Sequence, residues 1–163
     1  SSDLPQLFAR MAVKGLSGEQ IYDSVAQATG SYRPYNARNP FSFGGNDPRG
    51  EFLETVANNT DATTARQTTI LQALAMMNGQ LVANATNLSQ SRSLAAVAEF
   101  PGLTTAERIE NLYFLTLSRK PRPEEIERLV KYVERGGEKS DPKKSLGDVF
   151  WALLNSSEFM FNH

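Results

Sequence analysis

Residues 104–117 read Thr-Thr-Ala-Glu-Arg-Ile-Glu-Asn-Leu-Tyr-Phe-Leu-Thr-Leu, and this stretch decides the fold class. Thr104 and Glu107 have the spacing of a capping box, in which each side chain binds the backbone N–H group of the other residue. Apolar residues then follow on nearly every side of the helix that this start predicts. Because a helix that is apolar all round is buried, we expect a central helix here.

Helical patterns continue in both directions from this stretch. Pro123 before two acidic residues is typical of a first helical turn, and the two glycines at 136–137 are expected to end that helix. A last apolar stripe covers residues 145–154 and predicts a helix there. We expect Trp151, which lies within this stretch, to be part of the hydrophobic core. Toward the N-terminus, apolar residues at helical spacing predict helices over residues 4–11, 17–29, 68–78, 81–88 and 94–98. No β-hairpin pattern occurs, so we predict one all-α domain over residues 1–163, an irregular bundle of about six to eight helices.

Residues 30–50 interrupt the helical pattern with seven glycines and prolines, between which lie aromatic residues. This composition predicts a long loop with aromatic anchors. In one interpretation the loop binds a sugar or a carboxylate, because arginines and aromatic rings stack on or clamp such groups. In the other, its rings fill grooves between helices and its arginines cap helix ends. The candidate binding residues are Arg33, Tyr35, Arg38, Phe41 and Phe43.

Composition excludes several kinds of chemistry. The chain has 163 residues, no cysteine and one histidine, which is His163. Thiol nucleophiles, iron–sulfur clusters and cysteine-ligated zinc are therefore excluded, and a buried Ser-His-Asp triad is not expected. The net charge of −1 provides no global attraction to nucleic acid. No stretch approaches the roughly 18 apolar residues of a membrane span, so we expect none.

Charge is unevenly distributed along the chain. Residues 119–144 hold nine basic and six acidic side chains, a net charge of +3, whereas the remainder carries −4. One interpretation is a basic patch for phosphate or another polyanion. The interpretation that we favour from sequence is a solvated helix face, because Glu127 and Lys131 have the spacing of a stabilising pair. Tyr132 alone interleaves with the basic residues, so nucleic-acid binding is not expected.

Polar residues elsewhere favour structural roles. Arg66, Gln72 and Asn78 border or interrupt the apolar pattern at 68–78, and we expect them to pin the loop or the helix ends by hydrogen bonds. Neighbouring carboxylates occur at helix starts and on polar faces, where they stabilise the helix dipole. We therefore assign no catalytic residue, no metal ligand and no cofactor.

Four motifs resemble the C-terminal domain of unknown function of large planctomycete multidomain proteins of the PSCyt/PSD type, which carry cytochrome-c-like domains. They are Leu-Ser-Gly-Glu-Gln-Ile-Tyr-Asp-Ser at 16–24, Ile-Leu-Gln-Ala-Leu-Ala-Met-Met-Asn-Gly at 70–79, Leu-Thr-Leu-Ser-Arg-Lys-Pro at 115–121 and Val-Phe-Trp-Ala-Leu-Leu-Asn-Ser-Ser-Glu-Phe-Met-Phe-Asn-His at 149–163. The resemblance implies that the chain is the C-terminal part of a longer exported protein and is therefore periplasmic or on the cell surface. The segment has no Cys-x-x-Cys-His, so it does not itself hold a c-type haem.

Two functions are compatible with these patterns. The first is a non-catalytic helical interaction or structural module that docks on upstream domains of its own polypeptide, on a protein partner or on a surface polymer. The second is an accessory part of an enzyme for carbohydrate or redox chemistry, in which Arg33, Tyr35 and Arg38 would line a cleft with convergent polar groups.

Overall fold

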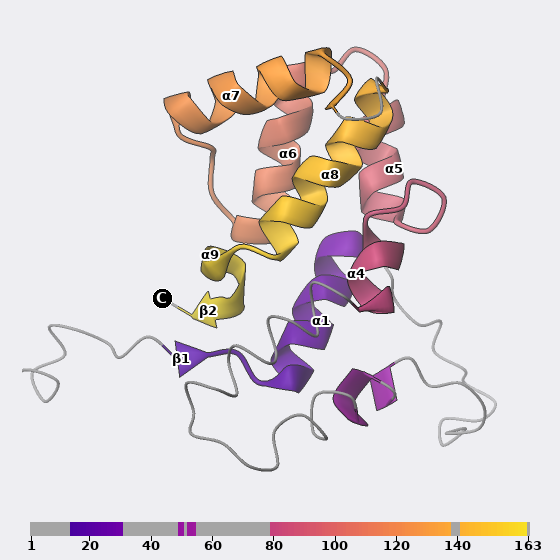
Figure 1. The fold of residues 1–163 in the computed structure, drawn as a ribbon, viewed down its shortest axis with the longest axis vertical. Helices are drawn as coiled ribbons and strands as arrows, with labels where there is room; N and C mark the ends of the chain where they lie inside the picture. Colours follow the sequence, from indigo (N-terminus) through magenta and orange to yellow (C-terminus); the bar gives the residue numbers. More distant parts are fainter. Residues whose placement is uncertain (1–13, 31–48, 51, 55–78, 138–140, 163) are drawn as a thin grey trace, which may run out of the picture.

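The computed structural model describes residues 14–30, 49–50, 52–54, 79–137 and 141–162. The chain is helical through most of these residues, which confirms the all-α class (Figure 1). The helices are α1 (Gly18–Thr29), α4 (Gln80–Ala85), α5 (Arg92–Glu99), α6 (Thr105–Leu117), α7 (Pro123–Glu134), α8 (Pro142–Leu154) and α9 (Ser157–Met160). The helices predicted over 4–11 and 68–78, and most of the predicted loop at 30–50, lie outside the described residues.

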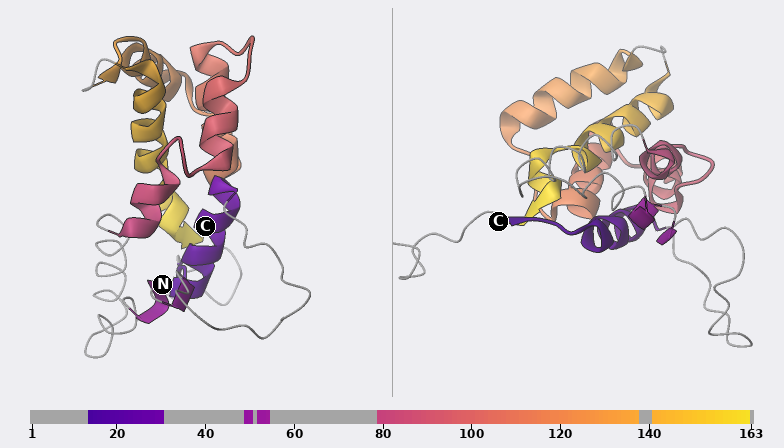
Figure 2. Two further views of the ribbon diagram at one scale, coloured as in Figure 1. Left: turned by 90° about the vertical axis from the view of Figure 1, so that its right-hand side faces the viewer. Right: turned by 60° about the horizontal axis from the view of Figure 1, so that its bottom comes forward.

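Helix α6 has the central position that its sequence predicts. It packs against α1, α5, α7, α8 and α9. Helix α7 lies across one end of the bundle and α1 lies at the other end (Figures 1 and 2). The two longest of the described helices, α6 and α8, contribute a large share of the core between these ends. The largest fully buried apolar side chains are Phe150, Ile21, Leu94, Ile109, Leu112, Leu154, Val25 and Val82.

The helix starts that carry capping-box patterns form as predicted. In α6, Glu107 N–H donates to Thr104 Oγ1 at 3.3 Å, and Thr104 N–H donates to Glu107 Oε2 at 2.8 Å. The same reciprocal pair joins Ser17 and Gln20 at the start of α1. Helix α1 ends at Gly30, whose φ of +67° is a left-handed conformation that glycine adopts without steric cost.

Other boundaries differ from those predicted. Helix α8 begins at Pro142, because the Asp141 carboxylate accepts hydrogen bonds from two N–H groups of the first turn. The predicted start at Ser145 is therefore wrong, and Ser145 is buried inside the helix. The helix predicted over 81–88 ends at Ala85. The residues that follow form a turn, in which the Asn87 side chain accepts a hydrogen bond from Ser89 N–H at 3.0 Å.

The predicted loop also ends earlier than residue 50. Residues 49–50 and 52–54 are helical. This short segment lies against α1, with the rings of Phe52 and Tyr22 5.9 Å apart between centroids. Arg49 Nε is 3.3 Å from Asp23 Oδ1, which adds an ion pair at the same contact. These two contacts hold the short helical segment against α1.

Trp151 is not a core residue, so that prediction is wrong. Its exposed fraction is 38%, whereas the adjacent Phe150 is fully buried. Successive residues of a helix point about 100° apart, so the face that buries Phe150 directs Trp151 toward solvent. On α6, Phe114 and Leu115 are likewise exposed by 46% and 38%. Helix α6 is therefore central but has one open side.

A short β-contact joins two distant parts of the described chain. Strand β1 (Lys14–Gly15) pairs antiparallel with β2 (Phe161–Asn162), with Lys14 opposite Asn162 and Gly15 opposite Phe161. Leu16 N–H extends the contact by donating to the Met160 carbonyl at 3.0 Å. Strands of two residues leave no alternating pattern, so sequence periodicity does not detect them. The pair fixes the segment before α1 against the end of the chain.

Gly147 allows α8 to approach the end of α4 closely. A Cβ atom at this position would lie 2.8 Å from the Thr86 carbonyl oxygen, which is a backbone atom. Ala is normally preferred to Gly inside a helix by about 1 kcal/mol. Here we expect Gly147→Ala to destabilise the domain by about 1 kcal/mol, because the steric penalty of overpacking exceeds that preference. Urea unfolding measures the change, and a stabilised variant would contradict the close approach.

Candidate functional site

The residues that the sequence singles out as a site lie outside the described part of the chain. The candidate loop residues Arg33, Tyr35, Arg38, Phe41 and Phe43 all lie outside the described residues. So do the three polar residues Arg66, Gln72 and Asn78. The structure instead brings together two other groups of charged side chains, one around Arg119 and one along α7.

Arg119 lies between α6 and α7 and binds two carboxylates. Its Nη1 and Nη2 donate to Oε2 and Oε1 of Glu125 at 2.9 and 3.1 Å. Its Nε and Nη2 donate to Oε1 and Oε2 of Glu158 at 2.6 and 2.8 Å. The guanidinium carbon also lies 5.1 Å from the centre of the Tyr113 ring, within the range of a cation–π contact. One side chain therefore joins α6, α7 and α9.

The electrostatics of this cluster match its geometry. Hydrogen bonds from Arg119 lower the pKa of Glu125 to about 2, and they also lower the pKa of Glu158. The two carboxylates in turn raise the pKa of Arg119 above its usual value. Both acids are thus held ionised by one cation, which is the opposite of the arrangement needed for a general acid. We interpret the cluster as structural: it connects the motif at 115–121 to the closing motif at 149–163.

The lowered pKa of Glu125 makes stability depend on pH. A carboxylate with a depressed pKa contributes stability that is fully present above the pKa of the unfolded chain and is lost as pH falls through the folded pKa. We therefore expect the melting temperature to fall between about pH 5 and the folded pKa of Glu125, which is about 2. Glu125→Gln should lose part of this dependence. Melting curves across the acid range measure it, and an unchanged slope in the variant would contradict the assignment.

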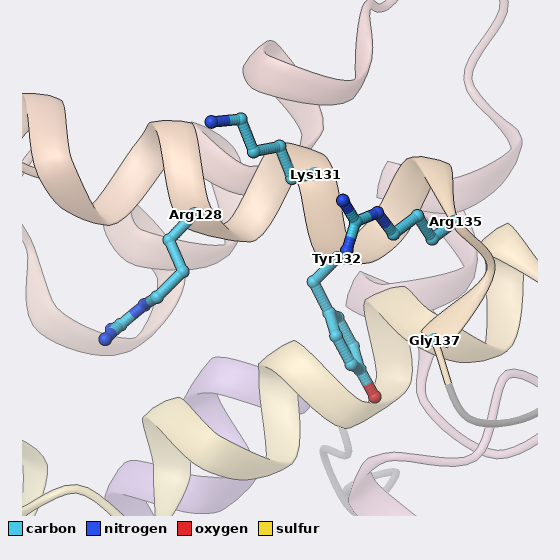
Figure 3. Close-up of a pocket in the computed structure, with 5 residues that line it drawn as sticks. All are labelled: Arg128, Lys131, Tyr132, Arg135 and Gly137. Atoms are coloured by element: carbon cyan, nitrogen blue, oxygen red, sulfur yellow. The ribbon is translucent and has the colours of Figure 1, made fainter.

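The second group of charges borders a hollow along α7. The hollow has a volume of about 430 Å³ and is lined by Arg128, Lys131, Tyr132, Arg135 and Gly137 (Figure 3). Arg128, Lys131 and Arg135 have the spacing i, i+3, i+7, which places them on one side of the helix. We call this feature the basic groove.

The wall of the basic groove is fixed by contacts to α8. Tyr132 points toward α8 (Figure 3), where its hydroxyl group donates to Asp148 Oδ2 at 3.0 Å. Gly137 has a φ of +58°, and a Cβ there would lie 2.9 Å from the Tyr132 ring and 2.7 Å from Ser145 Oγ. Only glycine fits this conformation and this contact without displacement. The groove is therefore held by packing between the end of α7 and α8.

Of the three cations of the groove, Lys131 has an acidic partner, whereas Arg128 and Arg135 have none among the described residues. Lys131 Nζ lies 2.6 Å from Glu127 Oε1, which confirms the pairing expected from their spacing. Within the described part of the chain, the side chains of Arg128 and Arg135 make no hydrogen bond or ion pair. Arg119, by contrast, is matched by two carboxylates. Two of the three cations that line the groove are therefore without an acidic partner among the described residues.

Sequence reasoning noted the positive charge of this segment but did not select these residues as a site. The i, i+3, i+7 spacing of the three cations, followed by the glycine pair at 136–137, is the pattern that would have indicated them. The hollow itself depends on the contact between α7 and α8, which no local pattern contains.

Other kinds of site are not found in the residues that the structure describes. There, no group of three or more histidine, aspartate or glutamate side chains is arranged to hold a metal ion. Among the described helices, none is long and apolar enough to cross a membrane.

The described residues form a helical domain with a basic groove along α7. Comparison with protein families gives a match over residues 50–133, just over half of the chain, to PSD1, described as a protein of unknown function (DUF1553). The chain belongs to this family. The matched region includes α4, α5 and α6 and most of α7. No curated protein and no solved structure matches the chain.

Proposed function

We propose that this domain is a non-catalytic helical docking module whose binding surface is the basic groove of α7. It acts within an exported, multidomain protein of the planctomycete type that carries cytochrome-c-like domains, and it docks on other domains of the same polypeptide. The compartment in this proposal is extracytoplasmic, as the sequence resemblance implies.

One observation carries the proposal. The domain neutralises Arg119 with two carboxylates, yet Arg128 and Arg135 border a hollow without an acidic partner among the described residues. Exposed basic side chains around a concave surface attract and orient a partner of opposite charge. The residues on which an accessory enzymatic role would depend, Arg33, Tyr35 and Arg38, lie outside the described residues. Docking is therefore the function that the described geometry supports best.

Hydrogen exchange tests the proposal directly. The exchange of backbone amides in α7 is compared between residues 1–163 alone and the full polypeptide. We expect slower exchange at residues 128–136 in the full polypeptide, because a docked domain restricts opening and solvent access there. Helix α1 lies at the opposite end of the bundle from α7 and is the internal control (Figure 2).

The outcomes separate docking from general stabilisation. Slower exchange confined to α7 and the adjoining part of α8 supports the proposal. Equal exchange of α7 in both samples would contradict docking on the same polypeptide. Slowing by the same factor in α1 and α7 would indicate a more stable domain without a defined docking surface.

A further inference from the structure

We infer that the basic groove takes an acidic polypeptide segment whose carboxylates repeat at helical spacing. This inference rests on the proposed docking function and adds the chemical class of the partner. The groove lies on α7 and is bordered by Arg128, Lys131 and Arg135, with the ring of Tyr132 and Gly137 between α7 and α8.

The spacing of the cations indicates the form of the partner. Arg128 and Arg135 are seven residues apart, which corresponds to about 10 Å along a helix axis, and Lys131 lies between them. A second helix laid beside α7 has the same rise per residue. If the second helix runs antiparallel to α7, glutamates at i, i+4 and i+7 on it match the order of the three cations, because reversing the direction turns the intervals of three and four residues into four and three.

The directions of the side chains argue against one small anion as the main ligand. Figure 3 shows the ends of Arg128 and Lys131 pointing in different directions from α7. A single phosphate-sized group consequently does not contact all three cations at once. Separate carboxylates along one segment do not have to meet at one point, and the planar guanidinium group of each arginine binds a carboxylate through two parallel hydrogen bonds.

Two further observations agree with a carboxylate partner. Lys131 Nζ lies 2.6 Å from Glu127 Oε1 on an exposed face, where an ion pair contributes little free energy. A glutamate of the partner therefore replaces Glu127 as the partner of Lys131 at little cost. Residues 119–144 carry a net charge of +3, whereas the rest of the chain carries −4. The three cations of the groove belong to this positive segment, which favours a partner of negative charge.

Fluorescence anisotropy with a defined peptide tests the inference. The probe is a labelled helical peptide with glutamate at positions i, i+4 and i+7, and the matched control peptide has glutamine at these positions. We expect the affinity for the glutamate peptide to fall about tenfold in Arg128→Gln/Arg135→Gln, since each exposed ion pair contributes modestly. Arg92→Gln is the control variant, because Arg92 is an exposed cation on α5, outside the groove.

Competition distinguishes the sources of negative charge. We expect the glutamate peptide to bind more tightly than inorganic phosphate, and binding to weaken at about 1 M salt, where the Debye length is about 3 Å. Equal binding of the glutamine peptide, or equal loss in Arg92→Gln, would overturn the inference. So would dextran sulfate binding through Arg128 and Arg135 when the glutamate peptide does not bind. None of these three outcomes changes the protection of α7 expected in the full polypeptide. Hydrogen exchange therefore tests the docking function separately from the chemistry of the partner.

Discussion

Phe150→Ala is expected to lower the free energy of unfolding by about 3–5 kcal/mol, the largest effect that we predict for this domain. Phe150 is fully buried on α8, and α8 packs against α4, α5, α6, α7 and α9. Removing the ring leaves a cavity among helices that cannot all move inward together. Because a domain of this kind has a total stability of about 5–15 kcal/mol, the variant loses a large share of it. Urea unfolding followed by circular dichroism measures the change.

Phe100→Ala is the matched control for this experiment. Phe100 follows α5 directly and its exposed fraction is 60%, so its truncation removes little buried surface. We expect a change within about 0.5 kcal/mol. Equal losses in the two variants would mean that burial of the Phe150 ring is not what stabilises α8.

The helices that could be predicted from sequence are those whose ends are determined locally. Ser17 with Gln20, and Thr104 with Glu107, are three residues apart, and their capping interactions need no distant partner. Gly30 ends α1 for an equally local reason, since its positive φ is a property of one residue. Sequence patterns are informative where the interaction lies within one turn.

The features that sequence patterns did not predict depend on neighbouring elements. The helical repeat alone does not tell which of two adjacent aromatic residues, Phe150 or Trp151, is buried, because this depends on where the other helices lie. The same holds for Phe114 on the open side of α6. The basic groove belongs to this class as well, since Tyr132 and Asp148 form its wall only once α7 and α8 are in contact.

The Arg119 cluster gives a structural role to two charged residues whose pairing hydrophobic periodicity does not reveal. Arg119 and Glu158 are 39 residues apart in the chain and are joined by two hydrogen bonds. Both lie in motifs that carry the family resemblance, and neither was selected from sequence. A charged residue with a distant partner looks the same as a solvated one until the fold is known.

Arg119→Ala is expected to destabilise the domain by about 2 kcal/mol, the second largest effect. The substitution removes four hydrogen bonds to carboxylates and the contact with Tyr113, and it leaves Glu125 and Glu158 without their cation. Hydrogen bonds to charged groups contribute about 1.5–3 kcal/mol each when they are buried. The smaller figure applies here because the side chains of Arg119 and Glu158 are 26% and 39% exposed. Urea unfolding near neutral pH measures the loss, with Arg92→Ala as an exposed control.

A double-mutant cycle distinguishes a coupled cluster from separate surface charges. If Arg119 stabilises the domain through Glu158, then Glu158→Ala should cost much less in the Arg119→Ala background than in the wild type, with a coupling free energy of about 1 kcal/mol.

Arg119→Lys should restore only part of the stability, because an ammonium group cannot bind two carboxylates with the fork of a guanidinium. The difference between wild type and Arg119→Ala should also shrink as pH falls toward the folded pKa of Glu125, which is about 2, since protonated acids no longer need the cation. Additive losses at every pH would show that Arg119 and the two glutamates act independently, and the connection between α6, α7 and α9 would then depend on apolar packing alone.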